Sequence, residues 1–155
     1  LNYSIYLIQD SSVNAFTAGG YIFINTGLLN FCITTSELAT IIAHEIAHNE
    51  KKHINLILKR IKNAGSLGDF LYVMKQLFTQ SFNQFNELEA DCYAADLVYG
   101  AGYDPRAGLR IWQSLAKNES DDKALKILMS HPYSKERYEC LKSHIITNYK
   151  NLNLE

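Results

Sequence analysis

The sequence predicts an α+β fold, in which a small N-terminal β-sheet is followed by a mainly helical body. Two segments near the N-terminus, residues 3–8 (YSIYLI) and 20–25 (GYIFIN), are rich in the Tyr, Ile and Phe residues that favour strands. From Thr34 onward, the apolar residues recur at helical spacing. The chain has 155 residues, of which 47% are hydrophobic and 20% charged, and this composition is typical of one globular domain with a sizeable core.

Turn and cap residues separate the first predicted elements. Asp10-Ser11-Ser12 predicts a turn after the first strand, and Gly19-Gly20 predicts a hairpin or a close backbone approach before the second. Thr34 and Glu37 have the spacing of a capping box. They are expected to begin a long helix that runs toward Gly65.

The rest of the chain predicts further helices with recognisable boundaries. Gly100 and Gly102 end one of them, and Asp104-Pro105 supplies a cap and a first-turn proline for the next. The expected helices cover about 67–79, 82–99, 105–117, 121–129 and 134–149.

Composition and spacing argue against several classes of protein. Lys and Arg total 15 and Asp and Glu total 16, so the net charge of -1 gives no basic field for nucleic acid. No run approaches the roughly 18 apolar residues that a transmembrane helix needs. Cys32, Cys92 and Cys140 are widely spaced, which predicts neither a disulfide framework nor a thiolate zinc site. Because the chain starts at Leu1 without Met, we expect a fragment or a processed form of a longer protein.

The segment from His44 to His48 is an H-E-x-x-H motif inside a helical pattern. His44 and His48 lie on one face of a helix, so both imidazoles can bind one metal ion. Glu45 can reach a water on the open side of that metal and act as a general base. The preceding residues 38–43 are almost wholly apolar, which predicts a buried helix whose polar side chains need partners. A hydrogen-bonded histidine pair without a metal is the alternative.

A catalytic zinc site needs a third protein ligand. Glu87 and Asp91 share one helix face, so Glu87 is predicted to bind the metal and Asp91 to accept the free ring N–H of a ligand histidine. Glu89 is expected to point the other way. Asp96 is a rival ligand on the opposite side of the helix from Glu87, and a solvated acidic face is the alternative to both. His53, about 140° from His48 on a continuous helix, is expected to be a surface or packing residue.

Several segments match a known family in the same order along the chain. They are Asn14–Phe16, Gly19–Phe23, Thr26–Leu29, His44–His48 with His53, Glu87–Asp91, Tyr103–Pro105, His131-Pro132 and Arg137. Together they resemble the zinc endopeptidase family of the CAAX prenyl protease, the HtpX-like proteases and the soluble BepA-like proteases.

The resemblance implies a zincin-like domain of the gluzincin type, in which His44, His48 and Glu87 hold one Zn²⁺ per chain. Residues 1–155 would form a single catalytic domain of the soluble branch. The resemblance also implies a bacterial cell envelope location, in the periplasm. A partner-binding domain, which some members carry, would be either missing from this chain or absent by nature.

The family places the His-Pro segment beside the active site, which gives His131 two predicted roles. It either donates a hydrogen bond to the oxyanion of the tetrahedral intermediate or binds zinc as a removable fourth ligand; a structural loop histidine is the alternative. Arg137 is expected either to stabilise the same developing charge or to make a structural ion pair.

The predicted function is zinc-dependent hydrolysis of peptide bonds in misfolded or envelope proteins, with Glu45 as general base. A metal-stabilised module that binds client proteins without cutting them is the alternative, and a wholly structural use of the motifs is another. Residues 19–24 are expected to be either an edge strand to which an extended substrate adds or an internal strand of the sheet.

Overall fold

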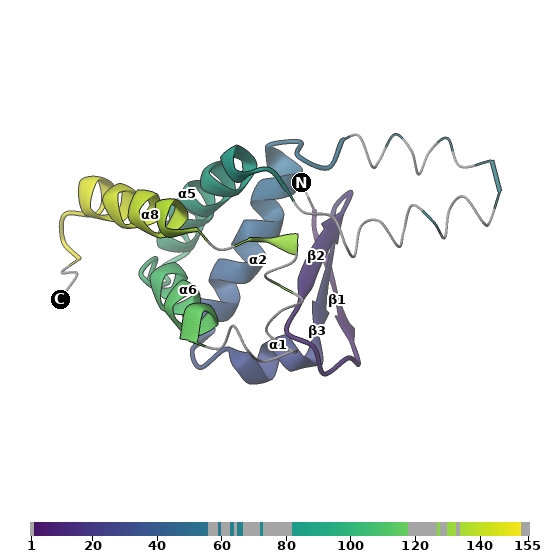
Figure 1. The fold of residues 1–155 in the computed structure, drawn as a ribbon, viewed down its shortest axis with the longest axis horizontal. Coiled ribbons are helices and arrows are strands. Elements are labelled where there is room, and N and C mark those ends of the chain that lie inside the picture. Colours follow the sequence, from purple (N-terminus) through teal and green to yellow (C-terminus); the bar gives the residue numbers. More distant parts are fainter. Residues whose placement is uncertain are drawn as a thin grey trace.

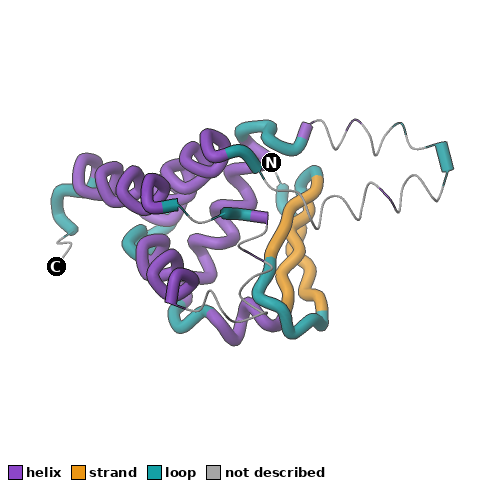
Figure 2. Tube along the Cα trace, viewed as in Figure 1, coloured by secondary structure: helices purple, strands orange, loops and turns teal. Residues whose placement is uncertain are grey.

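The computed structural model describes residues 2–55, 59, 63, 65–66, 72, 82–117, 127, 130–132 and 134–152. A three-stranded sheet lies on one side of the molecule and a group of helices on the other, with α2 (Thr35–Glu50) between them (Figure 1). Figure 2 shows the same division, with strands in orange and helices in purple. The α+β prediction is therefore confirmed.

The sheet contains β1 (Ser4–Ile8), β2 (Ala15–Ala18) and β3 (Tyr21–Asn25), in the order β1-β3-β2. β1 pairs with β3 in parallel, and β2 pairs with it antiparallel. The hairpin between β2 and β3 turns at Gly19 and Gly20, which have φ values of 58° and 95° that favour glycine. Because β3 is the middle strand, the internal-strand alternative for residues 19–24 is confirmed and the edge-strand alternative is wrong.

The strands differ in how they are buried. β3 alternates, so that Ile22 and Ile24 enter the core while the ring of Phe23 stacks on Phe16 of β2 on the other face. β2 is buried over its first three residues and packs on α2, where the Asn49 amide donates to the Thr17 hydroxyl. β2 thus joins the sheet to the helix that carries the H-E-x-x-H motif.

A short helix that the sequence analysis did not predict, α1 (Thr26–Phe31), follows β3. Gly27 allows it to pack on the turn after β1. A Cβ atom at this position would lie 2.2 Å from the carbonyl oxygen of Ser11, and the Gly27 N–H donates to the carbonyl of Asp10. The glycine is required here by the close backbone approach.

α2 begins at the predicted capping box of Thr34 and Glu37 but ends at Glu50, not near Gly65. Lys51 caps the helix, and Lys52 adopts a left-handed conformation with φ 62°. The chain then turns back, so that the N–H of His53 donates to the carbonyl of His48 over 2.9 Å. The predicted end was wrong because the chain leaves the helix at a turn that apolar periodicity does not encode.

The remaining described helices are α5 (Gln84–Gly100), α6 (Ala107–Lys117) and α8 (Lys135–Asn148), within a few residues of the predicted bounds. The predicted helices over 67–79 and 121–129 lie outside the described residues, apart from Tyr72 and Ile127. Within the described part of the chain, no helix is long and apolar enough to cross a membrane.

Candidate metal centre

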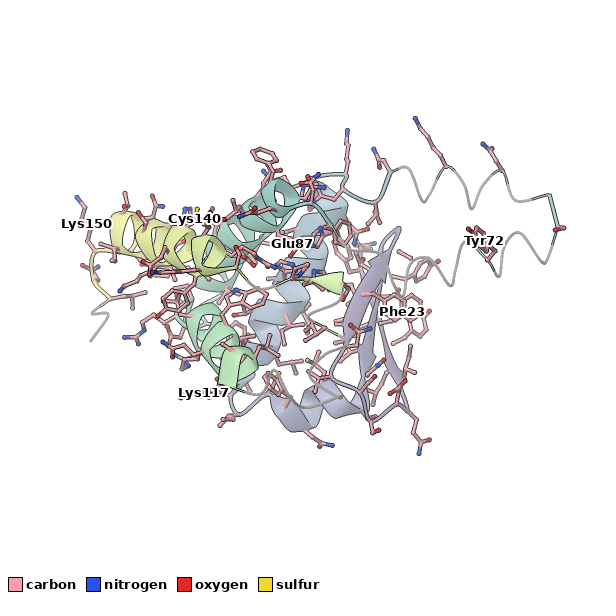
Figure 3. All side chains as sticks on the ribbon, viewed as in Figure 1. Phe23, Tyr72, Glu87, Lys117, Cys140 and Lys150 are labelled. Carbon is pink, nitrogen blue, oxygen red and sulfur yellow. The ribbon has the colours of Figure 1, made fainter. Side chains whose placement is uncertain are left out.

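Three parts of the chain meet at one buried polar cluster. α2 supplies His44 and His48, α5 supplies Glu87, and the segment before α8 supplies His131. Each residue offers one ligand atom, and these atoms lie within 4.8 Å of one another. Glu87 lies near the junction of α5 and α2 (Figure 3), and α5 is the helix that packs most extensively on α2. The structure therefore brings the three predicted ligands together.

The separations within the cluster match those of a tetrahedral metal site. Nε2 of His44 lies 3.0 Å from Nε2 of His48 and 3.3 Å from Oε2 of Glu87, and Nε2 of His48 lies 3.5 Å from Oε1 of Glu87. Zinc–ligand bonds of about 2.0–2.1 Å give a tetrahedron whose edges are about 3.3 Å. Two imidazoles and one carboxylate at these separations fit a zinc ion.

His131 completes the cluster on its fourth side. Its Nδ1 lies 3.1 Å from Oε1 of Glu87 and 3.3 Å from Nε2 of His44, at ligand-like separations. Its Nε2 lies 3.4 Å from Oε1 of Glu45, the predicted general base. His131 can therefore occupy either a ligand position or a position beside the reacting groups.

Behind the ligands lies a second set of charges. Oδ1 of Asp91 lies 3.0 Å from Nδ1 of His44, which is the predicted contact. Arg137, only 1% exposed, forms a two-pronged contact with Asp91 at 2.8 Å for each pair and reaches Oε2 of Glu87 at 2.8 Å. It also donates to the carbonyl of Pro132 and lies over the ring of Trp112. Arg137 thus connects both carboxylates to α8.

These neighbours set the proton affinities of the buried groups. Burial disfavours the charged imidazole of His44, but hydrogen bonds to Asp91 and Glu87 outweigh burial and raise its pKa to about 10. Burial and the charge of His44 lower the pKa of His48, so His48 stays neutral. Burial raises the pKa of Glu45, which is 2% exposed. A carboxylate with raised proton affinity is suited to take a proton from water.

An apolar pocket adjoins the cluster. Its lining includes the polar residues His44, Glu45, Asp91 and His131 and the apolar residues Ile111, Trp112 and Leu115. A pocket of this kind can receive an apolar group next to the polar cluster.

The structure also brings in two residues that the sequence analysis did not assign to the site. Nδ1 of His53 lies 3.0 Å from Nδ1 of His48, and its Nε2 lies 3.1 Å from Oε2 of Glu89. The prediction assumed a continuous helix through His53, and the turn at Lys52 moves this side chain back toward His48. The sequence carries no signal for that turn, because lysine rarely adopts a positive φ.

The rival ligand lies elsewhere. Asp96 is half exposed and contacts the C-terminal part of the chain, with Oδ1 2.7 Å from Nε2 of His144 and a hydrogen bond from the Tyr149 hydroxyl. It is not a member of the metal-ligand cluster described above.

Comparisons with known proteins agree with this geometry. The profile of peptidase family M48 matches residues 1–145. The chain is similar to the mitochondrial metalloendopeptidase OMA1 of Arabidopsis thaliana, with 32% identity over 91% of this chain and 31% of that protein. It is also similar to the beta-barrel assembly-enhancing protease of Yersinia pestis, with 28% identity over 87% of this chain and 33% of that protein. The metalloprotease LoiP of Escherichia coli (strain K12) is 28% identical over 94% of this chain and 63% of its own length.

Proposed function

Because the chain belongs to peptidase family M48, we propose that it is a zinc endopeptidase that hydrolyses peptide bonds in polypeptides. His44, His48 and Glu87 would hold one zinc ion per chain, in a gluzincin arrangement. The observation that carries this proposal is the convergence of their ligand atoms beside the buried carboxylate of Glu45. The similar proteins named above, which are metalloproteases, support the same class of reaction.

A bound zinc ion would supply an activated water and polarise the substrate carbonyl. Glu45 takes the proton of the attacking water and delivers it to the leaving amine nitrogen. Asp91 accepts the Nδ1 proton of His44. Without metal, the raised pKa of His44 keeps a second proton on Nε2, which faces Glu87; this proton would leave when the metal binds and free the Nε2 lone pair. Arg137 uses most of its N–H donors on Asp91, Glu87 and Pro132, so we propose that it positions the carboxylates and does not contact the oxyanion.

His131 favours a second candidate function. Its Nδ1 lies among the ligand atoms, and a fourth protein ligand would fill the position that catalysis requires to be open. We propose that His131 is a removable ligand that restrains the enzyme. If the position stays closed, the chain is a metal-stabilised module that binds client proteins without cutting them. His131→Ala should raise peptidase activity if His131 blocks the metal, and should lower it if His131 is an oxyanion donor.

The substrate would be an extended polypeptide. The apolar pocket beside Glu45 supports a preference for one apolar side chain near the cleaved bond. β2 is an edge strand next to α2, and main-chain pairing at its free side would bind a substrate without strict selection elsewhere. Cleavage-site profiling should show one apolar subsite; strict requirements at several subsites would argue against strand addition.

The chain spans between 31% and 45% of the length of the first relatives that it matches. We therefore propose that residues 1–155 are the catalytic domain of a longer protein that carries a partner-binding region. We also propose a role in protein quality control in the periplasm of a bacterial cell envelope; the similarity to the bacterial beta-barrel assembly-enhancing protease and to LoiP supports the envelope location.

The decisive experiment measures zinc content by elemental analysis together with hydrolysis of an unfolded protein substrate. Wild type should hold about one zinc per chain, Glu87→Ala should lose it, and Asp96→Ala should keep it. Glu45→Gln should retain zinc but lose hydrolysis by about 10²–10⁴-fold, the usual contribution of a general base. A wild-type protein without zinc after reconstitution, or an undiminished Glu45→Gln enzyme, would refute the proposal.

A further inference from the structure

We infer that His53 and Glu89 form a positioning chain behind His48 that orients this imidazole for zinc and tightens zinc binding. The inference rests on the proposed function, since it takes His48 to be a zinc ligand. His53 and Glu89 are not placed in contact with the substrate or the metal; they would act through His48.

The contacts form a continuous chain from the buried ligand to the surface. Nδ1 of His48 lies 3.0 Å from Nδ1 of His53, and Nε2 of His53 lies 3.1 Å from Oε2 of Glu89. The His48 side chain is fully buried and that of His53 is 6% exposed, whereas the Glu89 side chain is 35% exposed. The buried imidazole of His53 therefore separates the partly exposed carboxylate of Glu89 from the ligand cluster.

One placement of the ring protons gives His48, His53 and Glu89 a hydrogen-bond partner each. Nε2 of His48 faces Glu87 and His44, so it must carry a free lone pair to bind zinc. The proton of that ring then lies on Nδ1 and is donated to Nδ1 of His53. The proton of His53 must lie on Nε2, where it is donated to Glu89. An ionised carboxylate only accepts hydrogen bonds, so Glu89 can be the last acceptor in this row of contacts.

Through His53, Glu89 supports the imidazole of His48 in the way that Asp91 directly supports that of His44. A ligand imidazole whose second nitrogen donates toward a carboxylate keeps one tautomer and one ring orientation, and it becomes a stronger base for the metal. The backbone contributes as well, because the N–H of His53 donates to the carbonyl of His48 and fixes the turn at Lys52. Phe82 stacks on His48 at 3.9 Å between ring centres and limits ring movement from another side.

The test measures the zinc dissociation constant by competition with a chelator of known affinity. His53→Leu removes the acceptor and should weaken zinc binding about 10–100-fold, the usual effect of losing such a partner. His53→Asn keeps an acceptor near His48 Nδ1 and should recover part of this loss. Glu89→Ala should weaken binding by several fold. Lys51→Ala, which removes the ion pair of Lys51 with Glu89 but leaves His53 in place, is the matched control and should change affinity less than about twofold.

A double variant tests whether Glu89 acts through His53 or whether the two residues affect zinc binding separately. In the His53→Asn background, Glu89→Ala should cause no further loss, because the carboxylate acts only through His53. The absorption spectrum of the cobalt-substituted protein should change in His53→Leu and not in Lys51→Ala. Unfolding temperatures measured with excess chelator report whether a variant merely loosens the fold, and they should differ little among the variants.

The inference is overturned if His53→Leu binds zinc as tightly as wild type. It is also overturned if Glu89→Ala weakens zinc binding as much in the His53→Asn background as it does alone. These results would leave the proposed function intact as long as wild type binds zinc and Glu45→Gln is inactive. Failure of wild type to bind zinc would instead reject both.

Discussion

Arg137 is a buried cation that contacts two carboxylates of the proposed metal centre. Its side chain reaches Asp91 and Glu87 and is 1% exposed. Arg137→Met should lower the free energy of unfolding by about 3–5 kcal/mol, because it removes the guanidinium from two buried carboxylates and leaves them sharing the imidazole of His44. Arg137→Lys should cost less, since it keeps the charge and loses the planar fork. Urea unfolding with excess chelator measures both; a loss below about 1 kcal/mol in Arg137→Met would contradict this account.

At the residue scale, the sequence could predict what local geometry determines. His44 and His48 share a face because they are four residues apart on one helix, and the same rule pairs Glu87 with Asp91. The contact of His53 with His48 depends instead on the positive φ of Lys52. The contact of Glu89 with His53 depends on how α5 packs against the turn after α2. Neither can be obtained from spacing alone.

Polar contacts join the start of α2 to the start of α6. The N–H of Asp104, just before α6, donates to the Ser36 hydroxyl in the first turn of α2. Arg110 of α6 contacts Asp104 at 3.0 Å and approaches Glu37 at 3.6 Å. The start of the helix that carries the H-E-x-x-H motif is therefore tied to the start of α6.

This junction should make stability depend on pH in acid. Burial alone would raise the pKa of Asp104, but hydrogen bonds from Arg106 and Arg110 outweigh it and lower the pKa. The folded pKa lies below the unfolded value of about 3.9, so Asp104 stabilises the fold above about pH 4 and loses this effect as the pH falls through the folded pKa. Asp104→Asn should therefore be less stable than wild type at pH 7, and the difference should shrink by about pH 3.

The measurement is the free energy of unfolding of both proteins at several pH values. Glu139→Gln, on an exposed position of α8, makes the same change of charge away from the junction and serves as the control. A difference between Asp104→Asn and wild type that stays constant down to pH 3 would argue against the ion pairs as its source.

The element scale also shows where sequence patterns fail. Thr34 and Glu37 correctly placed the start of α2, because a capping box is a local device. β2 was not predicted, since Ala15 and Ala18 have little strand preference and gain their place through pairing with β3 and packing on α2. Apolar periodicity is strong only in α6, and glycine, proline and cap residues helped to place the bounds of α5 and α8, whose buried faces include charged side chains.

Across the whole molecule, the proposed metal joins parts of the chain that are far apart in sequence. Its ligands come from α2 and α5, with His131 before α8, so bound zinc should stabilise the entire fold. At a free zinc concentration about 1,000 times the dissociation constant, the gain is about 4 kcal/mol. The unfolding temperature should rise with zinc for wild type and for Glu45→Gln, and Glu87→Ala should show no rise. An equal rise in Glu87→Ala would mean that zinc binds elsewhere.

The order of the cluster along the chain has a consequence for its biosynthesis. The proposed general base and two of the proposed ligands are made by residue 48, the third proposed ligand is at residue 87, and the arginine that contacts the carboxylates is at residue 137. Synthesis proceeds at about 5–20 residues per second, so several seconds separate the first of these residues from the last. During that interval a ribosome-bound chain lacks the completed centre, so the proposed peptidase activity would begin only after Arg137 has emerged.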